Sequence, residues 1–325
     1  MADSNMILEI KNLKLWYIVY KGYLKVLDGV NLSVRKGEKV GIVGEAGCGK
    51  TTTVKSILNI IPENQYLIPE GEIFYKGRDI LKMNEKEMNQ IRSGEISMIY
   101  QEPANALNPV FTIGQQMMDV VKYSEQGKGK SAEEQKEMVL QAIRQVFIPD
   151  PERIFDYYPN QLSGGMKQRI CIAMAIMTQR DLMIADEPGT ALDVTIQDQI
   201  HKTLNRLVDE RNMSLIMITH SLGVAREITD SINVMYAGTV VETADTAEVF
   251  RHTLHPYTIG LMDAVPRLSG GGIQEGIYGS IPDYQYPPKG CRFAPRCSRA
   301  TEQCRNCKPV LTDVGGGHKV ACFHV

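Results

Sequence analysis

The feature that most constrains the fold of this chain is a glycine-rich stretch, GEAGCGKT, at residues 44–51. An apolar run at 40–43 precedes it, and a helical pattern at 52–61, ended by Pro62, follows it. A buried strand, a glycine-rich turn and a helix in this order form the structural context of a P-loop. The glycines let backbone N–H groups point toward one centre, where the helix N-terminus adds partial positive charge. The stretch therefore predicts a nucleoside triphosphate site, in which Lys50 reaches the β- and γ-phosphates and the Thr51 hydroxyl ligates Mg²⁺.

A second helix start suited to phosphate lies at residues 162–169, LSGGMKQR. Ser163 is a good N-cap, and Gly164 and Gly165 leave the first N–H groups of the following helix accessible. At average composition this pattern arises by chance in far fewer than one in ~10⁴ chains of this length. We therefore expect these residues to contact phosphate and not only to begin a helix.

Two carboxylates follow another apolar segment, LMIA at residues 182–185. Asp186 and Glu187 come at the carboxyl end of this predicted central strand, and parallel α/β sheets bind their ligands at that edge. Asp186 is placed to hold Mg²⁺ indirectly, and Glu187 to polarise the attacking water. A further apolar strand at 214–219 ends at His220, which we expect to contact the γ-phosphate at the same edge.

The remaining periodicities predict a mixed α/β domain with an antiparallel region. Alternating or apolar runs predict strands at 7–10, 13–19, 28–34 and 71–75, and a hairpin of 232–236 with 240–241. Helical patterns begin near Asn84 and cover 117–148, whereas 105–116 is expected to be a loop, and 245–248 resemble a capping box. Glycine and proline are frequent at 266–290, which predicts a linker before a small cysteine-rich end module.

Charge and hydropathy argue against two classes of protein. The chain carries 36 basic and 38 acidic side chains, a net charge of −2, which gives no electrostatic footprint for nucleic acid. No apolar run approaches the roughly 18 residues needed to cross a bilayer, and the first residues lack the pattern of a secretory signal. We therefore expect a cytosolic chain that reaches a membrane only through a partner.

Together these motifs resemble the ATP-binding subunits of ABC transporters, over roughly residues 5 to 250. The family's Walker A motif matches 44–51, its Q-loop glutamine Gln101 and its signature 162–166. Its Walker B motif matches 182–187, its D-loop 191–193 and its switch histidine His220. The resemblance implies an α/β P-loop NTPase fold over 1–255, with a RecA-like core, an antiparallel β region and a helical subdomain inserted at about 102–168.

The resemblance also implies the residues of an ATPase site that uses ATP and Mg²⁺. The catalytic residues would be Glu187, His220 and Gln101, and the Mg²⁺ site would involve Thr51, Gln101 and Asp186. The aromatic residue that stacks on adenine in the family matches Tyr17, although Tyr20 and Tyr23 compete for this role. The nucleotide-binding residues would be Tyr17, Gly44, Gly47, Cys48, Gly49, Lys50, Thr51, Thr52, Gln101, Ser163, Gly164, Gly165, Asp186 and Asp193.

A closer resemblance is to the dipeptide/oligopeptide and nickel permease ATPases, through QEP at 101–103, ALNP at 106–109 and HPYT at 255–258. It implies the motor subunit of a peptide importer, on the cytoplasmic face of the membrane. Its partners would be integral-membrane permease subunits, a second ATPase subunit (identical or a paralogue) and, indirectly, an extracytoplasmic peptide-binding protein. Two subunits would close head to tail, so that Ser163 and Gly165 complete the partner's site, and the region 101–116 would dock on the permease.

Five cysteines crowd the last 35 residues, within a C-terminal extension expected at 256–325. In a reducing compartment such a cluster favours a metal over disulfides. Four of them resemble the relatives' pattern, C-x5-C-x6-C-x17-C, and these wide intervals favour an iron–sulfur cluster, [4Fe–4S] in type, over zinc. The expected ligands are Cys291, Cys297, Cys304 and Cys322, with Cys307 as the reserve and zinc as the alternative metal.

Other functions stay open at this point. A soluble ABC ATPase of DNA repair or chromosome mechanics needs a long coiled coil, for which the interval 101–162 is too short, and a translation-type protein needs two cassettes. A metal-sensing or assembly module would make the cysteine tail the functional part. An importer could also carry nickel or another small solute.

Overall fold

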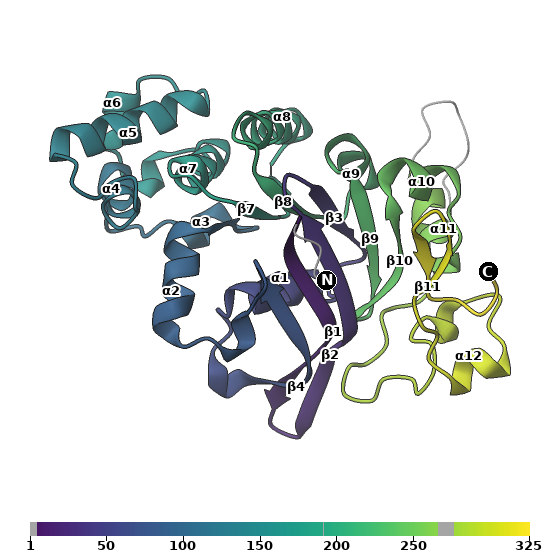
Figure 1. Cartoon of the computed structure of the whole chain (residues 1–325). Helices are drawn as coiled ribbons and strands as arrows, with labels where there is room; N and C mark the ends of the chain where they lie inside the picture. The colour runs from purple at the N-terminus through teal and green to yellow at the C-terminus, as the bar shows by residue number, and fades with distance from the viewer. Residues whose placement is uncertain (1–4, 191, 266–275) are drawn as a thin grey trace. The chain divides into compact units, whose positions relative to one another are not determined.

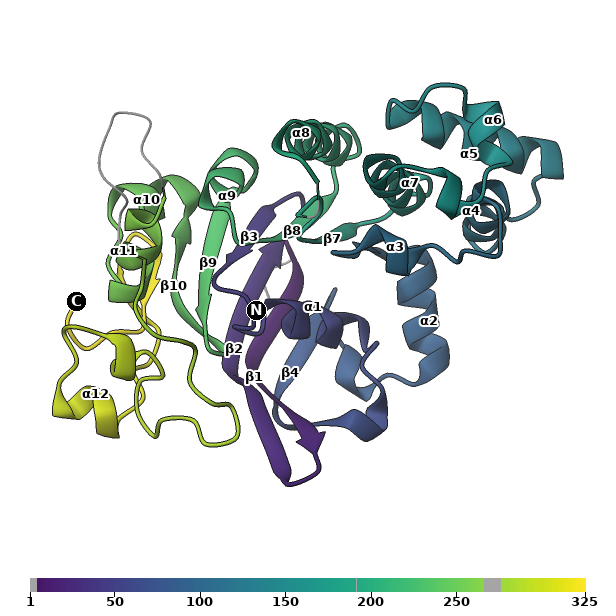
Figure 2. The same ribbon diagram turned by 180° about the vertical axis from the view of Figure 1, so that it is seen from behind.

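The computed structural model describes residues 5–190, 192–265 and 276–325 (Figure 1). The chain divides into two compact units. The first consists of Met1–Met83 together with Met217–Val325, and the second of Asn84–Ile216. In Figure 1 the second unit is the blue-to-teal part of the ribbon, and Figure 2 shows the same elements from behind. Ala191 and most of the predicted linker's glycine run lie outside the described residues.

An antiparallel sheet in the first unit confirms the predicted β region. Its strand order is β2-β1-β4-β5. The two strands expected at 7–10 and 13–19 form one strand, because a bulge at Asn12 carries the chain through. Asn12 has a φ of 47°, and its N–H donates to the side chain of Asn31 at 3.0 Å. The strands are β1 (Met6–Val19), β2 (Gly22–Arg35), β4 (Tyr66–Tyr75) and β5 (Arg78–Asp79).

A second set of strands in the first unit carries the P-loop. Its order is β11-β12-β10-β9-β3, and β3 runs parallel to β9 while the other pairs are antiparallel. Tyr236, Tyr257 and Phe293 pack together beside these strands, with ring centroids 4.7 to 5.4 Å apart. The strands are β3 (Lys39–Val43), β9 (Ser231–Tyr236), β10 (Thr239–Asp245), β11 (Thr312–Gly315) and β12 (His318–Val320), and β8 (Ser214–Thr219) spans the boundary of the two units.

Two details of the first unit's helices differ from the sequence expectation. The helix after the P-loop ends at Leu58, not at Pro62, because Asn59 adopts a left-handed conformation and its N–H bonds to the carbonyls of Lys55 and Ser56. A helix does follow Asp245, but Asp245 makes no side-chain cap bond. The helices are α1 (Lys50–Leu58), α9 (Leu222–Ile228), α10 (Thr246–Arg251), α11 (Pro256–Asp263) and α12 (Glu302–Asn306), with short 3-10 helices η1 (Glu63–Gln65), η2 (Ile80–Lys82) and η4 (Ala294–Arg296).

The second unit is mostly helical around two parallel strands, β6 and β7. One helix, α4, begins at Ile113 inside the segment that was expected to be a loop. The reason is a capping box, in which Thr112 and Gln115 satisfy each other's backbone N–H groups. The elements are α2 (Glu85–Gly94), β6 (Ile96–Ile99), α3 (Pro103–Ala106), α4 (Ile113–Lys122), α5 (Ala132–Gln145), α6 (Pro151–Phe155), η3 (Pro159–Gln161), α7 (Gly164–Ile176), β7 (Leu182–Asp186) and α8 (Val194–Glu210).

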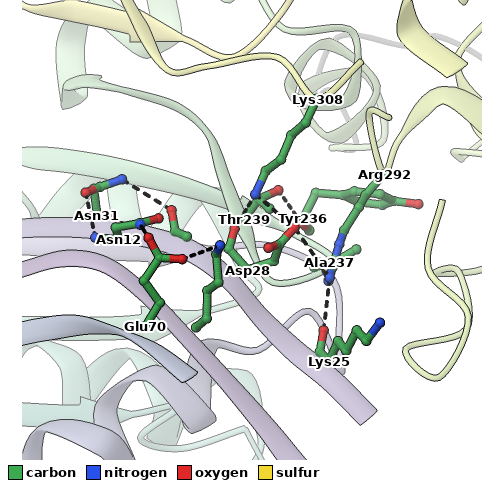
Figure 3. Close-up of polar contacts among 12 residues, drawn as sticks. Asn12, Lys25, Asp28, Asn31, Glu70, Tyr236, Ala237, Thr239, Arg292 and Lys308 are labelled. Carbon is green, nitrogen blue, oxygen red and sulfur yellow. Dashed lines mark hydrogen bonds and ion pairs between the residues drawn. The ribbon is translucent and has the colours of Figure 1, made fainter. Parts of the chain in front are cut away.

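The C-terminal extension is fastened to the first unit at several points. Its strand β12 pairs with β10, and Nε2 of the buried His318 lies 2.8 Å from Oε1 of Glu242. Figure 3 shows Lys308 and Arg292 reaching the other sheet at Asp28. Lys308 Nζ lies 2.8 Å from Oδ2 of Asp28, and Arg292 donates to the carbonyls of Lys25 and Ala237. The extension therefore packs as part of this unit's fold.

Replacing glycine by alanine should have opposite effects on stability at two positions of the second unit. In α4, a Cβ on Gly114 would lie 2.4 Å from the ring of Phe155, whereas a Cβ on Gly94 in α2 meets nothing within 4 Å. We predict that Gly114→Ala lowers the free energy of unfolding by about 1–3 kcal/mol through overpacking. Gly94→Ala should raise it by about 0.5 kcal/mol, because alanine loses less backbone entropy in a helix. Urea unfolding followed by circular dichroism measures both; equal effects would contradict the packing shown here.

Candidate functional site

The P-loop joins β3 to α1 in the first unit, as the sequence predicts. Gly44, Gly47 and Gly49 have φ angles of 155°, 80° and 105°, which side chains rarely adopt. Gly44 has a second reason to be glycine, because a Cβ there would lie 2.1 Å from the carbonyl oxygen of Met235 at the end of β9. The loop is therefore pressed against β9 along its backbone.

Lys50 is the first residue of α1 and is buried. Its Nζ donates to the carbonyl oxygens of Gly44 at 2.9 Å and of Glu45 at 3.1 Å. The ammonium group therefore spans the loop from its helical end to its first residues. This is the place from which a lysine can neutralise phosphate oxygens held by the loop's N–H groups.

Tyr17, Tyr20 and Tyr23 are the candidates for stacking on adenine. In the described residues, Tyr17 forms a hydrogen bond with α1, the helix that follows the P-loop. Its hydroxyl lies 3.3 Å from that of Thr52. Tyr20 is 99% exposed at the β1–β2 turn, and Tyr23 packs against Trp16 with ring centroids 5.8 Å apart. This geometry favours Tyr17 as the residue that stacks on adenine, which stays a prediction.

Cys48 lies inside the P-loop with its side chain fully buried. Burial raises the pKa of its thiol to about 11, so the side chain is a neutral, unreactive group at physiological pH. Its carbonyl oxygen accepts from the N–H of Gly238 at 2.7 Å. Cys48 therefore contributes packing and a backbone anchor, with no nucleophilic chemistry.

In the second unit, the buried strand β7 ends at Asp186, which is itself buried. Glu187 follows with a φ of 46°, a strained conformation for a residue with a side chain. Its Oε2 accepts from Gln101 Nε2 at 3.3 Å and from Thr190 Oγ1 at 3.2 Å. The predicted residues Gln101 and Glu187 thus meet. Thr190 was missed from the sequence, although its position three residues after Glu187 could have suggested it.

The signature residues begin α7 in the same unit. The Ser163 hydroxyl caps this helix by accepting from the N–H of Met166 at 3.3 Å, and Ser163 and Gly164 are exposed. A Cβ on Gly164 would lie 3.2 Å from Leu192, and one on Gly165 would lie 3.0 Å from Ile196. The two glycines therefore allow the N-terminus of α7 to lie close to the start of α8. The N-terminus of α7 nevertheless stays accessible to solvent.

The other two predicted residues also lie at element ends. Asp193 is exposed and caps α8, where its Oδ1 accepts from the N–H of Ile196 at 3.0 Å. His220 directly follows β8 in the first unit and is exposed. The position of His220 agrees with the strand expected at 214–219.

Four of the five C-terminal cysteines line one small pocket, and they are the four predicted ligands, Cys291, Cys297, Cys304 and Cys322. Cys307 is exposed and does not line it. The Cys304 Sγ lies 3.4 Å from Nε2 of His324. Within the described part of the chain, no three His, Cys, Asp or Glu side chains stand close enough together to hold one metal ion. The pocket thus brings the four cysteines together without forming a single-ion site in the described residues.

Family models match two parts of the chain. Residues 27–190 match the ABC transporter model, and residues 241–304 match the C-terminal region of oligopeptide/dipeptide transporters. Similar proteins include the dipeptide transport ATP-binding protein DppD of Bacillus subtilis, 40% identical over 98% of this chain and 94% of that protein. The oligopeptide transport ATP-binding protein OppD of Salmonella typhimurium is 41% identical over 98% of this chain and 94% of that protein.

A solved structure has the same fold over most of its length. It is a dimeric ATP-binding cassette in a post-hydrolysis state with ADP and phosphate bound, and it is 27% identical to this chain. The two align with a TM-score of 0.66 over 74% of this chain and 98% of that one. Together with the site geometry, these similarities show that the chain belongs to the ABC transporter family and is one of its ATP-binding, ATP-hydrolysing subunits.

Proposed function

We propose that this chain is the ATP-hydrolysing motor of an importer for di- and oligopeptides. The observation that carries this proposal is the match of residues 241–304 to the C-terminal region of oligopeptide/dipeptide transporters, which the ATPase motifs alone do not specify. Relatives that align over nearly the whole chain are named as dipeptide and oligopeptide transport ATP-binding proteins. No observation favours nickel, or an ATPase unconnected with transport.

In the proposed reaction, Glu187 is the general base that orients and deprotonates the attacking water. Its hydrogen bonds to Gln101 and Thr190 support this role, because they fix the carboxylate in one position. Lys50 neutralises the β- and γ-phosphates, and His220 contacts the γ-phosphate. Thr51, Asp186 and Gln101 would hold Mg²⁺, which would supply positive charge against the charge that develops in the reaction.

We further propose that two ATPase subunits pair head to tail, so that Ser163 and Gly165 of one complete the site of the other. The accessible start of α7 supports this, since its first N–H groups and the partial charge of its helix end are available to phosphate. The second subunit is a copy of this chain or a paralogue. Asp193, exposed at the start of α8, would lie at the same interface.

The permease would dock on the loop between α3 and α4, at the cytoplasmic face of the membrane. Val110 is 69% and Phe111 48% exposed, whereas Leu107 and Ile113 are buried and belong to the unit's own core. Gln116 holds this loop, because its side chain bonds the N–H of Asn108 at 2.8 Å and the carbonyl of Phe111 at 3.0 Å. No helix in the described residues has the length and apolarity of a membrane span.

The same cysteine pocket leads us to propose that the C-terminal module holds an iron–sulfur cluster, [4Fe–4S] in type. The convergence of four thiols supports the ligand set Cys291, Cys297, Cys304 and Cys322, and exposure of Cys307 argues against it as a ligand. A [4Fe–4S] cluster is larger than a single zinc ion, so its four thiolates need not converge on one point. Such a group would hold together a small module with little core of its own.

Two substitutions test the ATPase and its place in an importer. We predict that Glu187→Gln keeps ATP binding but lowers the hydrolysis rate by about 10²–10⁴-fold, because the general base is lost. Lys50→Ala should instead weaken ATP binding by at least about tenfold, through loss of a charge-assisted phosphate contact. Calorimetric titration and phosphate release measure the two effects separately. Near wild-type hydrolysis by Glu187→Gln would remove Glu187 from its proposed role.

The same Glu187→Gln protein, tagged and purified from detergent-solubilised membranes with ATP and Mg²⁺, should retain integral-membrane subunits and a second ATPase subunit. The reason is that bound, unhydrolysed ATP keeps the paired state closed. The Lys50→Ala protein is the matched control and should retain no paired ATPase subunit. Recovery of Glu187→Gln without membrane subunits would contradict the transport proposal.

For the cysteine module, we predict that anaerobically purified protein is brown and contains iron and acid-labile sulfide in equal amounts. Cys322→Ser should lose the colour, because a ligand is removed, and Cys307→Ser is the matched control that should keep it. Absorption spectra with iron, sulfide and zinc analysis measure these outcomes. A colourless protein with stoichiometric zinc and no sulfide would make the cluster proposal wrong.

A further inference from the structure

The C-terminal extension contacts the P-loop directly, through side chains that no motif identifies. Glu45, the second residue of the P-loop, forms a two-pronged ion pair with Arg296, from which it is 251 residues distant in sequence. Nη1 of Arg296 lies 2.8 Å from Oε2 of Glu45, and Nη2 lies 3.1 Å from Oε1. Such bidentate, charge-assisted pairs combine strength with a defined geometry.

Arg296 is held rigidly enough to act as a fixed support. Its Nε donates to the carbonyl of Tyr278 at 2.7 Å, and its Nη2 also donates to the carbonyl of Ile277 at 2.9 Å. Its side chain is only 6% exposed, and the Tyr236 hydroxyl lies 3.5 Å from Nη1. Arg296 also ends η4, directly before Cys297, which lines the cysteine pocket.

Two tyrosines hold the P-loop backbone next to this ion pair. The Tyr284 hydroxyl donates to the carbonyl of Gly47 at 2.7 Å, and the Tyr257 hydroxyl accepts from the N–H of Glu45 at 2.9 Å. Tyr284 is itself anchored, because its carbonyl accepts from the N–H of Lys25 at 2.8 Å. The peptide units 44–45 and 47–48 of the P-loop are therefore held by residues from the C-terminal part of the chain.

These contacts matter because a P-loop binds phosphate with its backbone. Its glycines permit the required geometry but do not enforce it, since glycine has the greatest conformational freedom of any residue. A loop that is already ordered loses less entropy when it binds its ligand, and binds more tightly for that reason. Arg296 and Tyr284 supply this order from outside the motif.

We propose that Arg296 and Tyr284 are positioning residues for ATP binding, and that the C-terminal extension is a working part of the nucleotide site. They touch neither ATP nor the attacking water but hold Glu45 and Gly47 in the phosphate-binding conformation. The inference rests on the proposed ATPase, yet it predicts a particular defect: weaker ATP binding with little change in the rate of the chemical step.

The test compares Arg296→Gln and Tyr284→Phe with matched controls in the full-length chain. Arg305→Gln changes an exposed arginine of the same module, and Tyr286→Phe removes a hydroxyl from an exposed tyrosine two residues from Tyr284. Calorimetric titration with ATP gives the Kd, phosphate release gives KM and kcat, and thermal unfolding reports stability. We expect the Kd and KM to rise about tenfold for Arg296→Gln and about threefold for Tyr284→Phe, with kcat within twofold and both controls unchanged.

A double-mutant comparison tests whether Arg296 affects ATP binding through its ion pair with Glu45. If Arg296 acts through Glu45, Glu45→Gln should weaken ATP binding as Arg296→Gln does, and the double variant should be no weaker than either single variant. Arg296→Lys, which keeps the charge but not the bidentate geometry, should recover part of the affinity. Additive losses in the double variant would overturn the proposed path.

The remaining outcomes also decide the proposal. If both Arg296→Gln and Tyr284→Phe bind ATP with wild-type affinity, the positioning proposal is wrong, but the proposed ATPase function is unaffected. If the wild-type chain fails to bind ATP, the proposed function itself is contradicted. If Arg296→Gln does not fold, Tyr284→Phe still decides, because it removes a single oxygen atom. A threefold affinity loss with an unchanged unfolding midpoint supports positioning, and a loss that follows the midpoint in every variant overturns it.

Discussion

The nucleotide site of this protein depends on the conformation of the P-loop, the turn between β3 and α1. The P-loop has few side chains of its own that could stabilise this conformation. The P-loop must present its N–H groups inward, and three glycines at positive φ make this possible. Its outer surface is fixed by backbone contacts, because Gly44 lies against the carbonyl of Met235 and the carbonyl of Cys48 accepts from Gly238. Lys50 closes the loop from within. The surrounding fold, more than the motif, keeps the phosphate-binding geometry in place.

A similar constraint acts on Glu187, the proposed general base. Glu187 follows a buried strand and takes a backbone conformation that costs of the order of 1–3 kcal/mol, a cost which the packing around it must offset. In return, hydrogen bonds from Gln101 and Thr190 hold its side chain in one position. Catalysis by a base of this kind gains from such preorganisation, since the group need not be ordered again at each turnover.

The C-terminal extension also stabilises the P-loop, through contacts from outside the motif. Lys308 and Arg292 fasten the module at Asp28 (Figure 3). Strand β12 pairs with β10, and His318 binds the buried Glu242. These anchors leave Arg296 and Tyr284 facing the P-loop, with the cysteine pocket immediately behind Arg296. A region that looks like an appendage in the sequence is thus part of the unit that binds the nucleotide. Residues 241–304, which overlap this region, match the C-terminal region of oligopeptide/dipeptide transporters.

The sequence by itself determined the features that depend on neighbours in the chain. The P-loop between a strand and a helix, the Ser163 cap, the acidic pair after a buried strand and the four cysteines all follow from short patterns, and the structure has them. The predicted end of the helix after the P-loop was wrong because Asn59 ends it in a left-handed conformation. The predicted loop at 105–116 was wrong in part because Thr112 and Gln115 form a capping box that begins α4. Only the tertiary structure decided which tyrosine approaches Thr52 and which residues hold Glu45. A pair separated by 251 residues leaves no periodicity or spacing to read, because its partners meet only after the sheets and the C-terminal extension have packed together.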